Sequence, residues 1–378
     1  MSLALPTGRR SLERTRPWAD GLAVLVCFLI PAVITVERFI ATARTNTFAV
    51  DFHNYYWPSG RDALHGVSPF PPPTQDAVFL IHAYPAGPYP APAVVLFAPF
   101  GLLPVWVGDA IFTAILVGAL IFALRLVGVR DWRCYGAAFL WAPVAYGLQT
   151  ANLTLLLTLG IAVLWRIRDR IVPSAVVVGV LVSLKLFLWP LVIWLIVTRR
   201  YIAAMYSVVV AGTITLLTWA VFGFAGLRDY PLVARIFTRY YETSTYTPFA
   251  LLVKLGAPTP LARAGGLALG LVALAAIFVT ARRNGTEAAP FALAIVAAVL
   301  LAPIVWLHYF ALLLVPLAVL SPTLSTAWLL PAILWVCPVG AATTAWKFAL
   351  PLVVFTVVLL LATNQRWKLR AIRTSSVA

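Results

Sequence analysis

The stretch VWVGDAIFTAILVGALIFALRLVG, residues 105–128, decides the fold of this chain. It is long enough to cross the hydrocarbon core of a bilayer, which takes about 20 apolar residues in a helix. No water reaches the backbone inside lipid, so a segment of this kind must satisfy its own peptide groups as a helix. The sequence therefore predicts a membrane-spanning helix here, and the same pattern recurs along the chain.

The composition extends this conclusion to the whole protein. Hydrophobic residues make up 62% of the sequence, charged residues 11%, and the mean hydropathy is +0.95, whereas soluble domains are about 45–50% apolar. The net charge of +16 comes from Lys and Arg that flank apolar runs, which indicates membrane orientation and argues against a nucleic-acid partner. Cys27, Cys134 and Cys337 show no CxxC spacing, so neither a disulfide framework nor a zinc site is expected.

Further apolar runs divide the rest of the chain into helices. They cover residues 20–42, 134–148, 151–165, 172–184, 187–198, 201–222, 260–281, 288–304, 306–320, 325–341 and 345–363. Several are too short for a full crossing, and Lys185 or Pro190 interrupts residues 172–198, so some pairs are expected to be half-depth hairpins facing a cavity. We predict an all-α, polytopic membrane protein with about 11–13 transmembrane helices, forming a single domain over residues 1–378.

Basic residues orient these helices. With the N-terminus inside, the arginines before residue 17 and the basic groups at 125–133, 166–170, 199–200, 282–283 and 366–373 fall on the cytoplasmic side, as the positive-inside rule requires. The same threading places outside a long loop, residues 45–104, that carries juxtamembrane helices, and a second loop, residues 223–256. We therefore expect a multi-pass plasma-membrane protein whose chemistry occurs at the external, periplasmic face.

Asp51 is the candidate for that chemistry. It begins the segment DFHNYYWPSG, residues 51–60, just past the first apolar run, in a chain with only 12 acidic residues. A carboxylate beside aromatic side chains at the membrane edge suits acid–base work, although it can also solvate a helix end or cap the next helix. The sequence motifs of ATP-binding loops, zinc hydrolases and serine hydrolases are absent. ATP and nucleotide sugars are cytoplasmic, so the donor substrate of an outward-facing site must be carried by lipid.

Five short motifs follow one another in a fixed order. They are Asp51-x-x-x-Tyr55-Tyr56-x-x-x-Gly60 with Gly66-x-x-Pro69-Phe70, then Tyr89-Pro90-x-Pro92 with Leu102-Leu103-Pro104, Gln149-x-x-Asn152, Leu184-Lys185-Leu186-Phe187, and Pro303-x-x-Trp306-x-His308. In this order the chain resembles glycosyltransferase family 87, which comprises actinobacterial enzymes of the GT-C fold that use polyprenyl-phosphate mannose or arabinofuranose. Each motif is short, whereas five in order over residues 51–310 are specific.

The resemblance implies a role for each matching residue. It implies a catalytic base at Asp51 and contacts to the donor phosphate or sugar from Lys185, His308, Tyr55, Tyr56, Asn152 and Gln149. The residues themselves support part of this, because a lysine between apolar runs is costly in lipid unless a ligand compensates it. Two alternatives remain open at this point: Lys185 can snorkel to an interface, and the His308 ring can simply pack against Tyr309.

The acceptor side is less well marked. Arg235 and Arg239, one helical turn apart beside Tyr240, are suited to an acceptor phosphate or glycan hydroxyls, and they are equally suited to lipid headgroups. His82 in the first loop is a further acceptor candidate. The spacings among His53, His65 and His82 match no compact ligand motif, so we expect neither a metal site nor a cofactor.

Two classes of function are compatible with this pattern. The first is an inverting glycosyltransferase that moves a sugar, with mannose favoured over arabinofuranose, from a polyprenyl-phosphate donor to a lipid-linked or cell-envelope glycan acceptor. The second is a flippase or transporter of lipid-linked sugars. Transporters are typically built from repeats with paired sites near mid-membrane. This chain instead gathers its acids and histidines in one asymmetric outer loop, which favours the enzyme.

Overall fold

The computed structural model describes residues 17–45, 47–70, 85–283, 287–337 and 344–375, and all regular structure in these ranges is helical. The first part of the chain forms α1 (Pro17–Val24), η1 (Leu25–Leu29), α2 (Ile30–Arg44), η2 (Phe52–Tyr56), α3 (Trp57–Leu64), α5 (Ala91–Phe97), η3 (Ala98–Leu102), α6 (Val105–Leu126), α7 (Trp132–Phe139), α8 (Ala142–Gln149), α9 (Thr154–Ile167) and α10 (Ile171–Leu184). The second part forms η4 (Leu186–Leu188), α11 (Pro190–Val197), α12 (Tyr201–Val221), α13 (Tyr230–Tyr241), α14 (Pro248–Lys254), α15 (Thr259–Arg283), α16 (Ala288–Leu301), η5 (Leu307–Leu313), α17 (Leu314–Leu320), α18 (Thr326–Leu329), η6 (Leu330–Val336) and α19 (Ala345–Ser375).

Four of these helices are long and apolar enough to cross a membrane by themselves. They are α6, α12, α15 and α19, and seven shorter apolar helical segments accompany them in the described residues. Large hydrophobic side chains stay exposed along α12 and α15, as on a surface that meets lipid tails instead of water. The all-α, polytopic class is confirmed. The expected number of crossings stays a prediction, because a short apolar helix does not have to span the bilayer.

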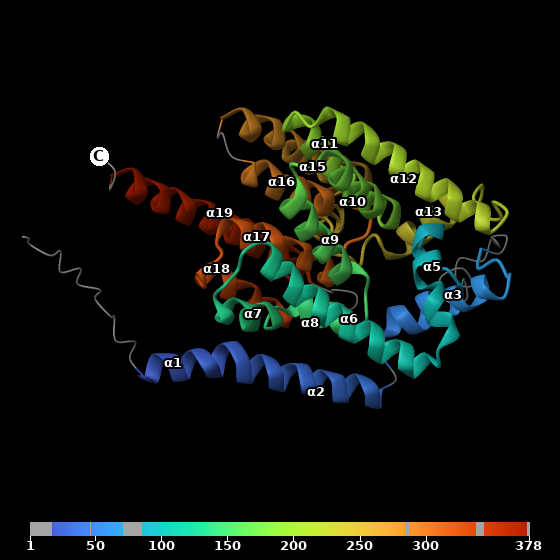
Figure 1. Ribbon diagram of the computed structural model, residues 1–378, viewed down its shortest axis with the longest axis horizontal. Helices are drawn as coiled ribbons and strands as arrows, with labels where there is room; N and C mark the ends of the chain where they lie inside the picture. The colour runs from blue at the N-terminus through green and yellow to red at the C-terminus, as the bar shows by residue number, and fades with distance from the viewer. Residues whose placement is uncertain (1–16, 46, 71–84, 284–286, 338–343, 376–378) are drawn as a thin grey trace, which may run out of the picture.

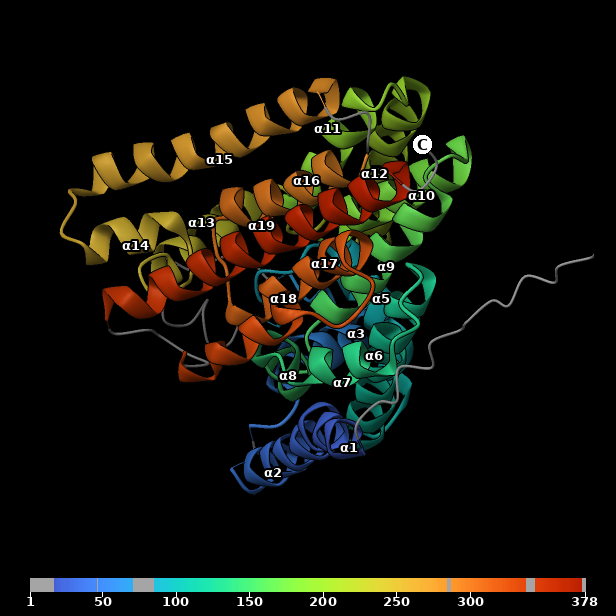
Figure 2. The same ribbon diagram turned by 90° about the vertical axis from the view of Figure 1, so that its left-hand side faces the viewer.

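The helices are arranged with two distinct ends. α3, α5 and α13 gather at one end of the molecule, where α12 finishes and α6 begins, whereas the last turns of α19 lie at the opposite end (Figure 1). Seen from the side, α1 and α2 form one edge of the structure and α15 forms the other (Figure 2). Phe291, Leu313 and Trp328 are among the residues that fill the buried core between these edges.

Proline explains where two of the expected runs break. The run 134–148 is not one helix: α7 ends at Phe139 and α8 begins at Ala142 with Pro143 in its first turn, because proline fits the start of a helix better than its interior. The expected interruption near Lys185 is confirmed. α10 stops at Leu184, and α11 starts only at Pro190.

An ion-pair network joins three helix ends at one pole of the molecule, the end opposite α13. Arg200, which precedes α12, binds Asp169 at 2.6 Å and Glu287 at 2.7 Å, and Glu287 also accepts from Arg168 at 2.9 Å. The ends of α9, α11 and the start of α16 are therefore fixed together. This places the basic groups at 166–170 and 199–200 on one side, as the charge pattern predicts.

Close backbone packing shapes the other pole. A Cβ on Gly60 of α3 would lie 2.6 Å from the Phe97 carbonyl oxygen, and one on Gly101 would lie 2.6 Å from the Arg61 Cα. Only glycine permits such an approach of α3 to η3. A small apolar cluster, which includes Phe70, Trp219 and Phe237, then holds α13 beside α5. These contacts fix the frame in which Asp51 is held.

Candidate active site

Two chain segments pair through their backbones to build the site. The Ala49 N–H donates to the Gln149 carbonyl at 2.8 Å, and the Asp51 N–H donates to the Thr150 carbonyl at 3.0 Å. Ala49 (φ 53°) and Ala151 (φ 48°) both adopt the left-handed conformation that L-residues avoid. Strained alanines of this kind persist only where the surroundings enforce them, and such positions cluster at functional sites.

The pairing brings Asn152 against Asp51. The Asn152 Nδ2 donates to Asp51 Oδ2 at 2.6 Å and lies 3.4 Å from the Tyr89 hydroxyl. Its Oδ1 accepts from the Thr154 N–H at 2.9 Å and from the Thr154 hydroxyl at 2.6 Å. A backbone N–H can only donate, so the amide oxygen must face Thr154 and the amide nitrogen must face Asp51. Asn152 therefore orients the carboxylate.

The two tyrosines after Asp51 have different surroundings. The Tyr56 ring stacks on Phe97 with centroids 4.1 Å apart, and its hydroxyl accepts from the Leu153 N–H at 3.3 Å, so this side chain belongs to the core that carries η2. Tyr55 is half-buried and contacts Tyr89 with ring centroids 5.9 Å apart. Of the pair, Tyr55 is the one with a face left open beside Asp51.

Lys185 reaches the same place from the gap between α10 and η4. Its backbone is extended (φ −146°, ψ 97°), and its Nζ donates to the Tyr309 hydroxyl at 3.2 Å and lies 4.3 Å from the Tyr89 ring centre. In the part of the chain that the structure describes, no carboxylate forms an ion pair with it. An ammonium has three donors, so Lys185 keeps hydrogen-bonding capacity for an anion.

His308 lies next to this lysine in the first turn of η5. Its side chain is buried, it contacts Tyr309 with ring centroids 5.0 Å apart, and it interacts electrostatically with Lys185. Within the described residues, His308 Nε2 and Gln149 Oε1 are buried without a hydrogen-bond partner. Buried polar atoms are normally paired. Both side chains are therefore available to a ligand, and packing against Tyr309 does not account for the whole of His308.

The surroundings make Asp51 a stronger base than an ordinary aspartate. Burial raises the pKa of the Asp51 carboxyl, while the hydrogen bond from Asn152 and the positive charge of Lys185 hold the increase in check. A base is most effective when its pKa approaches the working pH. The arrangement can therefore accept a proton at Asp51 and hold an anion at Lys185.

The residues expected to bind the acceptor are more exposed than the Asp51 cluster. Arg235, Arg239 and Tyr240 are exposed on α13, whereas Val233 and Phe237 of the same helix are buried. The arginines follow these buried residues by two positions, which is about half a helical turn, so they lie on the opposite face. His82 falls outside the described residues, and so does Asp76.

The structure adds partners that the sequence did not single out. Tyr89 and Tyr309 contact Lys185. Tyr89 stands within the quoted Tyr89-Pro90-x-Pro92 motif and Tyr309 directly follows the His308 motif, and this proximity to the motifs is the signal that was available. A second pair joins His53 Nδ1 to Asp109 Oδ2 at 3.2 Å and ties η2 to the N-terminal part of α6. No sequence signal predicted that contact. No group of three or more His, Cys, Asp or Glu side chains comes together among the described residues.

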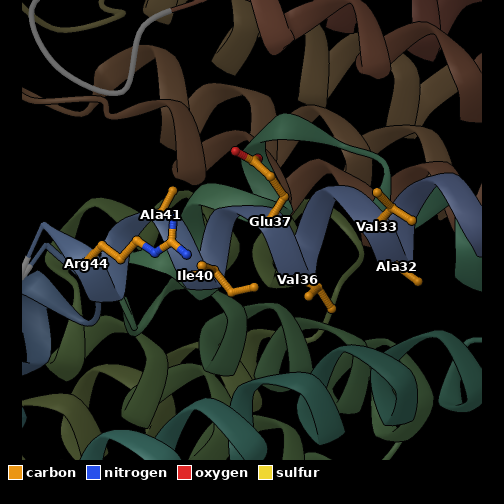
Figure 3. Close-up of a pocket in the computed structure, with 7 residues that line it drawn as sticks. All are labelled: Ala32, Val33, Val36, Glu37, Ile40, Ala41 and Arg44. Carbon is orange, nitrogen blue, oxygen red and sulfur yellow. The ribbon is translucent and has the colours of Figure 1, made fainter.

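A separate groove runs along α2 (Figure 3). It has a volume of about 470 Å³ and is lined by Ala32, Val33, Val36, Glu37, Ile40, Ala41 and Arg44. All of these residues belong to one helix, and none of them contributes to the Asp51 cluster. The groove therefore has no part in the arrangement described above.

Comparison with known proteins places these residues in context. The model of glycosyltransferase family 87 matches residues 88–308, more than half of the 378 residues. The matched region includes Tyr89, Asn152, Lys185 and His308, and it begins after Asp51. No curated protein and no solved structure matches the chain.

Proposed function

Because the chain belongs to glycosyltransferase family 87, we propose that this membrane glycosyltransferase moves a sugar from a polyprenyl-phosphate donor to a hydroxyl group of a glycolipid or cell-envelope glycan. The observation that carries the proposal is the convergence of Asp51, Asn152 and Lys185. The Asp51 carboxylate accepts a hydrogen bond from Asn152 and interacts electrostatically with Lys185, which has no carboxylate ion-pair partner among the described residues. They are the base and the phosphate ligand that such a transfer needs.

The chemistry follows from these roles. The acceptor hydroxyl loses its proton to the Asp51 carboxylate as its oxygen attacks the anomeric carbon of the donor sugar. The bond from that carbon to the phosphate oxygen breaks, and the polyprenyl phosphate leaves with the bonding electrons. One carboxylate suffices for this single displacement, because a phosphate leaves without protonation, and the anomeric configuration inverts.

Lys185 and His308 account for the donor phosphate. The Lys185 ammonium offers a charge-assisted hydrogen bond to the phosphate oxygens, and His308 Nε2 is a buried polar atom beside it. The apolar helices around both residues suit a donor whose polyprenyl chain stays in the bilayer. Such a donor supports a site at the external face of the plasma membrane, where cytoplasmic nucleotide sugars are not available.

The proposal is tested with purified protein and defined donors. Polyprenyl-phosphate mannose is the first donor to supply, and decaprenyl-phosphate arabinofuranose is the second. We expect one of them to be consumed, with release of polyprenyl phosphate and transfer of its sugar with inversion at the anomeric carbon. Movement of intact donor across a vesicle membrane without any glycosidic product would instead identify a flippase.

A further inference from the structure

Three aromatic side chains have no part in the mechanism above: Tyr55 and Tyr241, which interact electrostatically with Asp51, and Trp306, which contacts Tyr241. Tyr241 ends α13, and its ring lies 5.3 Å from that of Trp306 at an angle of 71°. The Tyr246 N–H donates to the Val305 carbonyl at 2.7 Å, so the segment after α13 is tied to the segment that carries Trp306. This backbone hydrogen bond therefore holds the segments that carry the two rings against each other.

Tyr55 interacts electrostatically with Tyr241 of this pair. Its ring rests on Gly87 (φ +54°), where a Cβ would come within 2.4 Å of the Tyr55 Cδ1, and it also touches Tyr89. Glycine at this position lets the Tyr55 ring pack directly against the backbone. The ring is therefore held rigidly at the edge of the site.

These side chains lie close to the base. Burial raises the pKa of Tyr55 and of Tyr241, and nearby phenol and carboxylate groups raise both further: Tyr55 responds to Tyr241 and Asp51, and Tyr241 responds to Tyr240 and Asp51. Both phenols therefore stay protonated and keep their hydrogen-bond donors. Asp51 also interacts with Lys185, the proposed ligand of the donor phosphate. It therefore lies between the aromatic side chains and the phosphate ligand.

We propose that Tyr55, Tyr241 and Trp306 form a subsite that binds the pyranose ring of the acceptor sugar. All three side chains are half-buried, so each keeps a face or an edge open. Aromatic rings offer a rigid apolar surface with a polar tip, which matches a sugar that has a C–H face and a rim of hydroxyl groups. None of the three side chains is charged, which suits a neutral hexopyranoside as the ligand.

The assignment to the acceptor, and not to the donor, follows from the geometry of displacement. It rests on the proposed function. The attacking hydroxyl and the departing phosphate lie on opposite sides of the anomeric carbon in an inverting transfer. Lys185 and His308 mark the phosphate side and the base marks the hydroxyl side. The aromatic group that borders Asp51 therefore holds the ring that carries the hydroxyl, and Tyr55, which the family resemblance assigns to the donor, contacts the acceptor in this proposal.

The test separates binding from transfer. Calorimetric titration with phenyl α-D-mannopyranoside, phenyl glucoside and phenyl galactoside requires no lipid donor. We expect at least one to bind the wild type, and Tyr241→Ala and Trp306→Ala to weaken it about tenfold, the loss expected for uncovering about half of an aromatic face. Trp106→Ala and Tyr201→Ala are matched controls, because both side chains are exposed and neither belongs to the proposed subsite; they should bind as the wild type does.

The variant Tyr241→Phe distinguishes loss of the aromatic ring from misfolding of the protein. It keeps the ring and removes only the hydroxyl, so binding should stay within about threefold of the wild type. If no phenyl hexopyranoside binds the wild type, or if Tyr241→Ala and Trp306→Ala bind like the controls, the subsite assignment is overturned. Failure of the proposed function looks different: the sugar still binds in an aromatic-dependent way, but neither lipid donor is consumed.

Discussion

At the scale of single residues, Asp51 owes its properties to its neighbours. Asn152 fixes the carboxylate through an amide that cannot turn round, because Thr154 occupies the amide oxygen. Lys185 adds a positive charge nearby without forming a close ion pair. A carboxylate in direct contact with an ammonium would be a weaker base. In the proposed mechanism, this separation lets Asp51 act on the proton while Lys185 binds the phosphate.

The first prediction concerns this carboxylate. Asp51→Asn keeps the size of the side chain and can still accept the Asn152 hydrogen bond, so the protein should fold and bind donor lipid. It cannot accept a proton at neutral pH, and we expect a loss of about 10²–10⁴ in the transfer rate. Asp62→Asn, in α3 just after the Asp51 segment, is the matched control. Near-normal turnover of Asp51→Asn would remove the base from the mechanism.

The second prediction concerns pH. The base works only when ionised, so kcat/KM should fall as the pH decreases through the Asp51 pKa. Burial raises that pKa above its usual value of 3.8, which places the acidic limb at a higher pH than an exposed aspartate would give. The Asn152 hydrogen bond lowers the pKa, so Asn152→Ala should move the limb to still higher pH. An unshifted pH–rate profile in that variant would show that Asn152 does not act through Asp51.

A third prediction separates the donor from the acceptor. Lys185→Ala should raise the KM for the polyprenyl-phosphate sugar by about 10- to 100-fold, because a hydrogen bond to a charged group contributes about 1.5–3 kcal/mol. Lys185→Arg should recover part of this loss, and Lys254→Ala should change nothing. An unaltered donor KM in Lys185→Ala would mean that this lysine only extends toward the membrane surface.

At the scale of elements, the site depends on two turns that helices alone would not produce. The left-handed Ala49 and Ala151 allow the segment that follows α2 to donate two backbone hydrogen bonds to the end of α8. The π-helical η2 then carries Tyr55 toward Gly87 and Tyr56 toward Phe97. The irregular segments around Ala49 and Ala151, and not the long membrane-spanning helices, therefore position Asp51.

The fourth prediction tests this strain. Ala151→Gly should keep or increase thermal stability in detergent, because glycine adopts positive φ at no steric cost. Ala151→Val should lower stability by about 1–3 kcal/mol and reduce transfer, since a β-branched residue is worse there than alanine. Ala268, exposed within α15, is the control of opposite sign: glycine there should destabilise by about 1 kcal/mol. Equal effects of glycine at both positions would contradict the strain at Ala151.

At the scale of the whole molecule, the two poles have opposite chemistry. One pole carries the arginine–carboxylate network around Arg200 and Glu287. The other carries Asp51, Tyr241 and the small helices α3 and α5 (Figure 1). The excess of arginine at the first pole is the pattern of a cytoplasmic face. The active site would then open to the outside.

The fifth prediction tests that orientation. In a background without native cysteines, His65→Cys, an exposed position just after α3, should react with a membrane-impermeant maleimide in intact cells. Tyr201→Cys, 61% exposed at the start of α12, should react only after the membrane is opened. The reverse labelling pattern would place the site on the cytoplasmic side and exclude the external reaction.

The sequence by itself determined the class of fold and the importance of several residues. The length of an apolar run and the pairing of its backbone groups within a helix are local properties. Runs such as 105–128 therefore predicted helices without knowledge of their neighbours. The interruption at Lys185 was likewise a local feature, because a charge and a proline each break an apolar helix. The order of the five short motifs indicated the family that the comparison with known proteins then showed.

Only the tertiary structure decided how those residues meet. Asp51 and Asn152 are 101 positions apart, and Lys185 and Tyr309 are 124 positions apart, so no local pattern fixes their contact. The opposite placements of Tyr55 and Tyr56 depend on a π-helical turn and on Gly87, and the outward face of Arg235 depends on the packing of Phe237. Side-chain contacts across the chain arise from the packing of whole helices, which one-dimensional periodicity does not encode.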